Sequence, residues 1–143
     1  MRTLFVVTDS ANLDNIVDAW LTVPDVAERL GLDVGKVRRL LQEGRLVGVR
    51  RGDPRVLSIP EAFLVPAHLA NPSAPTRPDE DAPAWTVLAS LQGTFTVLGD
   101  AGFDEAEMIQ WLFTEDESLA ARPIDALRSG GKTAVRRVAQ ALL

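Results

Sequence analysis

The chain has 143 residues, of which 46% are hydrophobic and 24% charged, and it contains no cysteine. This composition is that of a globular protein with one domain or two small ones; the lack of cysteine excludes disulfides, thiolate zinc sites and cysteine nucleophiles. No apolar run approaches the roughly 18 residues of a membrane helix, and the run Leu4–Val7 is shorter than the core of a signal peptide, so we expect a cytoplasmic protein with no membrane partner.

The net charge of −5 is unevenly distributed along the chain. Lys and Arg gather between Asp33 and Arg55 and again after Ala121, whereas Val56–Ala121 is acidic and has Arg77 as its only base. Nucleic-acid binding depends on local clusters of Lys and Arg more than on total charge. The first basic segment is therefore a candidate for contact with nucleic acid.

The first element in chain order is a short helix predicted over Ala11–Trp20. Its apolar residues, Leu13, Ile16, Val17 and Trp20, recur at helical spacing.

Two short helices joined by a tight turn follow. Thr22 is placed to cap the first helix, which Gly31 ends. Asp33 is placed to cap the second, Val34–Glu43, and Gly44 ends it. This pattern is typical of a helix-turn-helix.

The second of these helices has an apolar face and a basic one. Its apolar arc carries Val34, Val37, Leu40 and Leu41. An Arg can pair two acceptors of guanine and a Gln can pair adenine, so helix 34–43 suits the major groove, although a solvated surface helix would show the same pattern. The side chains that we expect to contact bases are Lys36, Arg38, Arg39 and Gln42.

A β-hairpin is predicted over residues 45–59, with strands at Arg45–Arg50 and Arg55–Ile59 and a turn at Arg51–Pro54; Pro60 then opens a short helix. A hairpin at this place is the wing of a winged helix-turn-helix. Ordinary surface arginines are the alternative to a role in binding phosphates or the minor groove. The arginines assigned to that role are Arg45, Arg50, Arg51 and Arg55.

The second half of the chain is predicted to be helical. Val65–Pro83 is rich in proline and reads as a linker or loop, and Trp85–Leu91 is a strand or a helix. Helices are then predicted at Gly93–Ala101, from a capping box at Asp104 to Leu112 or Phe113, at Ile124–Arg128 and at Thr133–Leu142. The expected fold is mainly α, with a winged helix-turn-helix and N-terminal extension at 1–65, a linker or loop at 66–84 and a C-terminal helical domain at 85–143.

An enzyme is the least supported class. The sequence has no Gly-rich phosphate loop, and its one histidine, His68, has no cysteine or second histidine with which to share a metal. Trp20, Trp85 and Trp111 stand in apolar contexts that favour core packing over base stacking. We expect no catalytic residue, no metal site and no cofactor.

Several segments carry a resemblance to known proteins. The stretch that holds LTVPDVA at Leu21–Ala27, LQEGRL at Leu41–Leu46 and SIPEA at Ser58–Ala62 resembles the excisionase and MerR-type winged-helix DNA-binding domain. The second half is similar to the C-terminal domain of a small actinobacterial family that joins it to such a winged helix. That similarity is carried by Met108–Thr114, Arg122–Leu127 and Val135–Gln140.

The resemblance implies DNA binding through the winged helix, with a C-terminal domain of undefined role. The leading hypothesis is a transcriptional regulator or nucleoid-associated factor that binds double-stranded DNA. The spacing of the second half also resembles the toxin-binding domain of Xre-type antitoxins, although the front half departs from the Xre helix-turn-helix. The alternative is therefore an antitoxin-like adaptor that binds a protein partner through residues 85–143. A homodimer also stays open, because one winged helix reads only a few base pairs.

Overall fold

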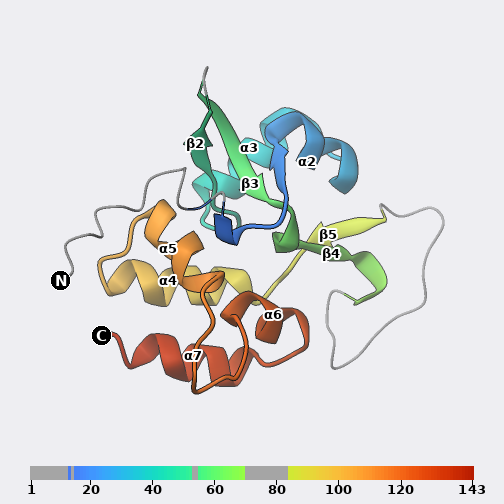
Figure 1. Ribbon diagram of the computed structural model, residues 1–143. Coiled ribbons are helices and arrows are strands. Elements are labelled where there is room, and N and C mark those ends of the chain that lie inside the picture. The colour runs from blue at the N-terminus through green and yellow to red at the C-terminus, as the bar shows by residue number, and fades with distance from the viewer. Residues whose placement is uncertain (1–12, 14, 53–54, 70–83) are drawn as a thin grey trace.

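The computed structural model describes residues 13, 15–52, 55–69 and 84–143. Figure 1 shows the helix-turn-helix and its hairpin in one half of the molecule and the C-terminal helices in the other. The elements are, in order, β1 (Trp20–Thr22), α2 (Val23–Leu30), α3 (Val34–Gln42), β2 (Val49–Arg51), β3 (Val56–Pro60), η2 (Glu61–Phe63), β4 (Leu64–Pro66), η3 (Ala67–Leu69), β5 (Trp85–Val87), α4 (Leu91–Asp100), α5 (Glu105–Leu112), α6 (Pro123–Arg128) and α7 (Lys132–Gln140).

The caps predicted for the helix-turn-helix are confirmed. The hydroxyl of Thr22 accepts a hydrogen bond from the backbone N–H of Asp25, and the Asp25 carboxylate accepts one from the backbone N–H of Thr22, at 3.3 and 3.1 Å. Gly31 ends α2 in the left-handed conformation, with φ of 67°. The carboxylate of Asp33 caps α3 by accepting from the backbone N–H of Lys36 at 2.8 Å. Local sequence thus fixes both helices of the motif.

The helix predicted over Ala11–Trp20 is shorter than expected. Of this segment, Leu13, Asn15 and Ile16 are helical, and the backbone N–H of Val17 donates to the carbonyl of Leu13; residues 11, 12 and 14 lie outside the described part. Trp20 begins β1 instead, because this segment pairs with β3 further along the chain.

The wing belongs to an antiparallel sheet of order β1-β3-β2. The predicted start of the first strand, Arg45, was wrong. Leu46 and Val47 are buried in the core, and β2 begins only at Val49. Arg51, predicted to lie in the turn, is the last residue of β2 and pairs with Val56. Residues 53 and 54 of the predicted turn lie outside the described part of the chain.

A second, two-stranded sheet joins the halves of the chain. The segment 65–83, predicted to be a linker or loop, begins with regular structure: β4 pairs antiparallel with β5, and η3 follows β4. Residues 70–83 lie outside the described part. Trp85 is in a strand, one of the two structures that the sequence left open.

The helical second half is confirmed. The helix predicted from Gly93 begins two residues earlier as α4, and Asp104 and Glu107 form the predicted capping box of α5. One hydrophobic core runs through both halves: the ring of Phe63, after the wing, lies 5.6 Å from that of Phe95 and 5.9 Å from that of Phe113. The helices therefore pack directly on the base of the wing.

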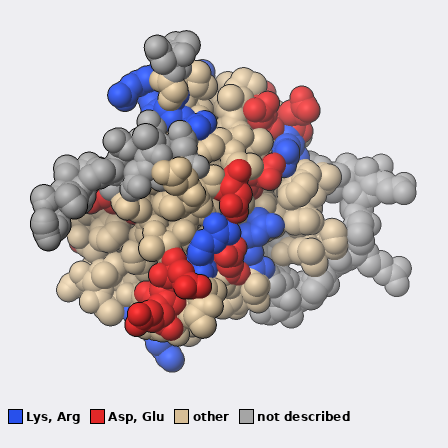
Figure 2. All heavy atoms as spheres, viewed as in Figure 1, with Lys and Arg blue, Asp and Glu red and all other residues tan. Residues whose placement is uncertain are grey.

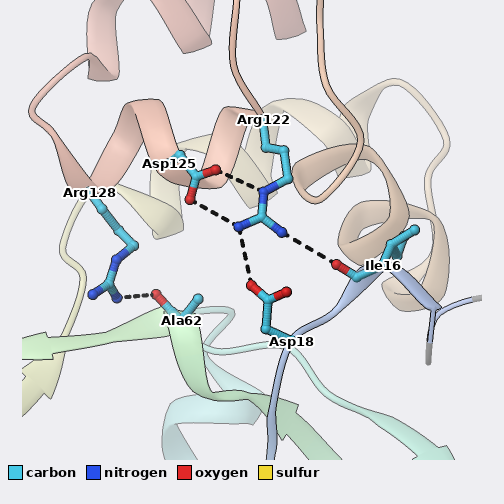
Figure 3. A network of polar contacts seen from close by, with 6 residues as sticks. All are labelled: Ile16, Asp18, Ala62, Arg122, Asp125 and Arg128. Carbon is cyan, nitrogen blue, oxygen red and sulfur yellow. Dashed lines mark hydrogen bonds and ion pairs between the residues drawn. The ribbon is translucent and has the colours of Figure 1, made fainter.

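Two arginines, Arg122 at the N-cap of α6 and Arg128 at its last residue, connect the C-terminal helices to both ends of the winged helix (Figure 3). Arg128 donates to the carbonyl oxygens of Ala62 and Leu64 at 2.7 and 2.6 Å. Arg122 pairs with Asp125 and also reaches Asp18, just before β1. The hydrogen bond to Asp125 raises the pKa of the Arg122 guanidinium, so it stays charged.

Candidate nucleic-acid interface

Helix α3 presents its basic face to solvent. Val37 is fully buried and anchors the helix, and Val34, Leu40 and Leu41 pack partly against the core. On the opposite side Lys36, Arg38, Arg39 and Gln42 are all exposed. The helix therefore buries its apolar arc and leaves a basic, amide-bearing surface open.

The arginines of the wing divide between two environments. Arg45, Arg50 and Arg55 are exposed. Arg51 is half-buried, and its guanidinium lies over the indole ring of Trp20, 4.7 Å from the ring centroid. Successive side chains of a strand point to opposite faces of the sheet, so Arg50 and Arg51 cannot share one face. The structure does not bring Arg51 together with the other arginines of the wing.

The hairpin and α3 occupy the same half of the molecule, and strands β2 and β3 extend away from α6 and α7 (Figure 1). Figure 2 shows Lys and Arg side chains gathered at the end where the hairpin projects, whereas those near the middle of this face are interleaved with Asp and Glu. Arg38 and Arg39 remain exposed, so no described part of the C-terminal half covers them.

Gln42 lies at the border between the two halves. It lines a groove of about 430 Å³ together with Leu41 and Leu57 on one side and Glu105 and Met108 of α5 on the other. A carboxylate and apolar side chains thus stand beside Gln42. Gln42 thus borders an apolar and acidic groove, whereas Arg38 and Arg39 are exposed to solvent.

The C-terminal half has the opposite charge on α4 and α5. Residues 84–121 contain no Lys or Arg, and their acidic residues stand in or after these two helices. Those acids are Asp100, Asp104, Glu105, Glu107, Glu115, Asp116 and Glu117. Acidic residues therefore dominate α5 and the segment after it, whereas α7, which packs against α4, carries the bases Lys132, Arg136 and Arg137.

Within the described ranges, no group of three or more His, Cys, Asp or Glu side chains could hold a metal ion. His68 lies half-buried in η3. None of the helices in those ranges is both long enough and apolar enough to cross a membrane.

The three tryptophans pack against the core, as predicted, and two of them also have an arginine guanidinium over the indole ring. Beside the pair of Arg51 and Trp20, Arg29 lies over Trp85 at 5.3 Å and forms a 2.9 Å ion pair with Glu61. The position of Arg29 over Trp85 could not be predicted from the sequence, because no local pattern links α2 to a strand more than fifty residues away.

Comparison with known proteins agrees with the two-part arrangement. Residues 8–64 match the family described as "DNA-binding protein Rv2175c, wHTH domain", and residues 88–143 match "Rv2175c C-terminal domain of unknown function". The curated relative "DNA-binding protein Rv2175c" of Mycobacterium tuberculosis (strain ATCC 25618 / H37Rv) is 36% identical over 132 residues, which are 84% of this chain and 77% of the relative. A solved structure, "NMR structure of Rv2175c", superposes with a TM-score of 0.66 at 35% identity and covers 86% of this chain and 80% of that one.

Proposed function

The chain belongs to the Rv2175c family, and from that premise we propose that it binds double-stranded DNA through its winged helix-turn-helix. The family membership confirms the resemblance to a small actinobacterial winged-helix family. In the proposed complex α3 enters the major groove and the hairpin β2–β3 contacts the phosphate backbone.

The observation that carries this proposal is the exposed pair Arg38 and Arg39 on a helix anchored by the buried Val37. A helix of this kind fits the major groove, where each guanidinium can pair with the O6 and N7 acceptors of guanine. Lys36 and Gln42 extend the same surface. Arg45, Arg50 and Arg55 are the proposed phosphate contacts, which position a protein on the duplex without reading its sequence.

For the C-terminal half we propose a bracing role within this function. The boundaries expected from the sequence then separate a DNA-contacting part, 1–65, from a supporting part, 85–143. Two contacts support this role: the edge-on and tilted contacts of the Phe63 ring with two rings of the helical half, and the hydrogen bonds from Arg128 to the backbone after the wing. Both restrain the base of the wing, and a restrained wing loses less conformational entropy on binding.

The test is a salt titration of binding to a random-sequence duplex, followed by fluorescence anisotropy. If about four to six of the basic groups neutralise phosphates, the logarithm of the association constant falls with the logarithm of salt concentration with a slope of about −0.9 per contact. The double variant Arg38→Ala, Arg39→Ala should lose affinity and shift this slope toward zero. The matched control is Lys132→Ala, Arg137→Ala, which removes two exposed charges from α7. Equal losses in the two variants, or none in the first, would refute the proposed interface.

The regulatory role is a separate proposal, tested by sequence selection from a pool of random duplexes. We propose that Arg38 and Gln42 give the protein a preferred site, as a transcriptional regulator requires. Specific binding typically exceeds non-specific binding by a factor of about 10³ or more. Enrichment of one motif supports a regulator, and recovery of unselected sequence supports a nucleoid-associated factor.

Sedimentation of the selected complex then gives the number of protein copies on the DNA site, and so tests whether the protein binds as a homodimer.

A further inference from the structure

A pocket of about 320 Å³ lies between the helix-turn-helix and the β4–β5 sheet. Leu32 and Leu40 line it from the turn and from α3, and Trp85 and Val87 line it from β5. Figure 1 shows the β4–β5 sheet beside the helix-turn-helix half. The pocket is thus built from two segments that only the fold brings together.

The walls of this pocket are apolar and only partly covered. Leu32, Leu40, Trp85 and Val87 each pack against the core on one side and stay half-buried, which leaves part of each side chain facing the pocket. Small-molecule sites are typically concave, mostly apolar and about 300 to 1,000 Å³ in volume, with a few polar groups that fix the ligand. The volume and the lining agree with such a site.

Among the described residues that line the pocket, Arg45 is the one with a charged side chain. Its backbone N–H donates to the carbonyl of Leu40 at 2.9 Å, after Gly44 has turned the chain with φ of 75°. In the described part of the chain, Arg45 forms no ion pair. The other arginine near Trp85 is Arg29, which already pairs with Glu61. Arg45 is therefore the cation available to a ligand in this pocket.

We propose that this pocket binds a small amphiphilic carboxylate. The apolar part of the ligand lies between Leu40 and Trp85, and its carboxylate accepts hydrogen bonds from the guanidinium of Arg45. A guanidinium suits this role because it can donate two parallel hydrogen bonds to one carboxylate. Arg45 is also one of the phosphate contacts proposed above, so a bound carboxylate lowers the affinity for DNA, a consequence that rests on the proposed function.

The probes are decanoate and decanol, which share an alkyl chain and differ in charge. Binding to the full chain is followed without DNA by tryptophan fluorescence and by isothermal titration calorimetry. We expect decanoate to bind more tightly than decanol by about tenfold, the effect of one charge-assisted hydrogen-bonded pair. Arg45→Gln should remove this difference, whereas Arg50→Gln, the matched loss of an exposed charge, should preserve it.

A second variant tests the place of binding. Ala67 lines the pocket, and Ala67→Phe should fill it and abolish binding of both probes; a circular dichroism melt confirms that the variant folds. Equal binding of the two probes, an unchanged difference in Arg45→Gln, or retained binding in folded Ala67→Phe would each overturn the proposal. If neither probe binds and Ala67→Phe changes the sedimentation of the protein, the pocket is instead an interface between two copies.

A final measurement separates this proposal from the proposed function. Saturating decanoate should weaken DNA binding by the native chain and leave that of Ala67→Phe unchanged. Because the pocket is measured first without DNA, failure of the ligand to bind and failure of the protein to bind DNA are independent results.

Discussion

The guanidinium of Arg51 lies over the indole ring of Trp20, 4.7 Å from its centroid. Arg51 ends β2 and Trp20 begins β1, so this contact spans the sheet from one outer strand to the other across β3. A cation over an aromatic face stabilises by about 0.5 to 1 kcal/mol at an exposed site. The contact therefore helps to fix the wing on the body of the molecule.

Arg50 and Arg51, though adjacent, should respond differently to substitution. Arg51→Ala should lower the melting temperature by a few degrees, because the contact with Trp20 is lost. Arg50→Ala should leave the melting temperature unchanged and shift the salt slope of DNA binding by about one contact. Thermal unfolding and the salt titration, applied to both variants, measure this division, and the reverse pattern would contradict it.

Thr22→Ala should destabilise the protein by about 1 kcal/mol, the usual cost of removing a helix N-cap. The free energy of unfolding in urea measures the effect. The control is Thr96→Ala: the Thr96 hydroxyl donates to the carbonyl of Gln92 inside α4, where alanine is the better helix former. Equal destabilisation by both changes would show that the hydroxyl of Thr22 does not act as a cap.

The stability of α2 should depend on pH through Asp25. Hydrogen bonds from the backbone N–H of Thr22, and then from its side chain, lower the pKa of the Asp25 carboxyl below its ordinary value. The folded state therefore holds the proton less tightly than the unfolded state, so the stabilisation is complete above the unfolded pKa and is lost as the pH falls through the folded pKa. The difference in unfolding free energy between the native chain and Asp25→Asn should accordingly shrink in acid. A difference that stays constant below the unfolded pKa would contradict this account.

Gly48→Ala should destabilise the wing, whereas Gly99→Ala should stabilise the protein. A Cβ at Gly48 would lie 2.8 Å from the backbone oxygen of Ser58 in β3, which cannot move without distorting the sheet. A Cβ at Gly99 would meet only the Met108 side chain, at 3.5 Å, and alanine is favoured over glycine in a helix by up to about 1 kcal/mol. Urea unfolding measures both changes, and we expect only Gly48→Ala to weaken DNA binding.

Arg128→Ala should cost roughly 1 to 3 kcal/mol for a backbone carbonyl left without its donor. The carbonyls of Ala62 and Leu64 accept from Arg128, and Leu64 is fully buried. If the C-terminal half braces the wing, DNA affinity should fall as well. Arg137→Ala, on the exposed face of α7, is the control and should change neither property.

The parts of the fold that the sequence predicted are those with local causes. The caps at Thr22, Asp33 and Asp104 and the left-handed turn at Gly31 each act within a few residues, and all are as expected. The strands β1, β4 and β5 are three residues long, too short for a periodic signal, and their partners lie 19 or more residues away. Only tertiary pairing defines these strands. At Trp20 the local spacing of apolar residues therefore predicts a helix, whereas pairing with β3 makes a strand.

The same distinction applies to the candidate site. Val37 and its neighbours set which face of α3 is buried, so the outward position of Arg38 and Arg39 followed from helical periodicity. The environment of Arg51 depends on where β2 ends, because a shift of one residue along a strand exchanges its two faces. The pocket beside Arg45 joins α2 and α3 to Ala67 and to Trp85–Val87, a proximity that no local pattern contains.

The absence of Lys and Arg from residues 84–121 gives the molecule an electrostatic dipole. In the proposed complex a duplex attracts the end that carries α3 and the hairpin and repels the acidic side chains of α5 and of the segment after it, while the bases of α7, packed against α4, offset part of this repulsion. The resulting torque turns the protein during its diffusional approach, so a larger share of collisions begins with the hairpin facing the phosphates. A chain of net charge −5 can thereby associate with a polyanion, and the advantage fades as salt shortens the range of the field.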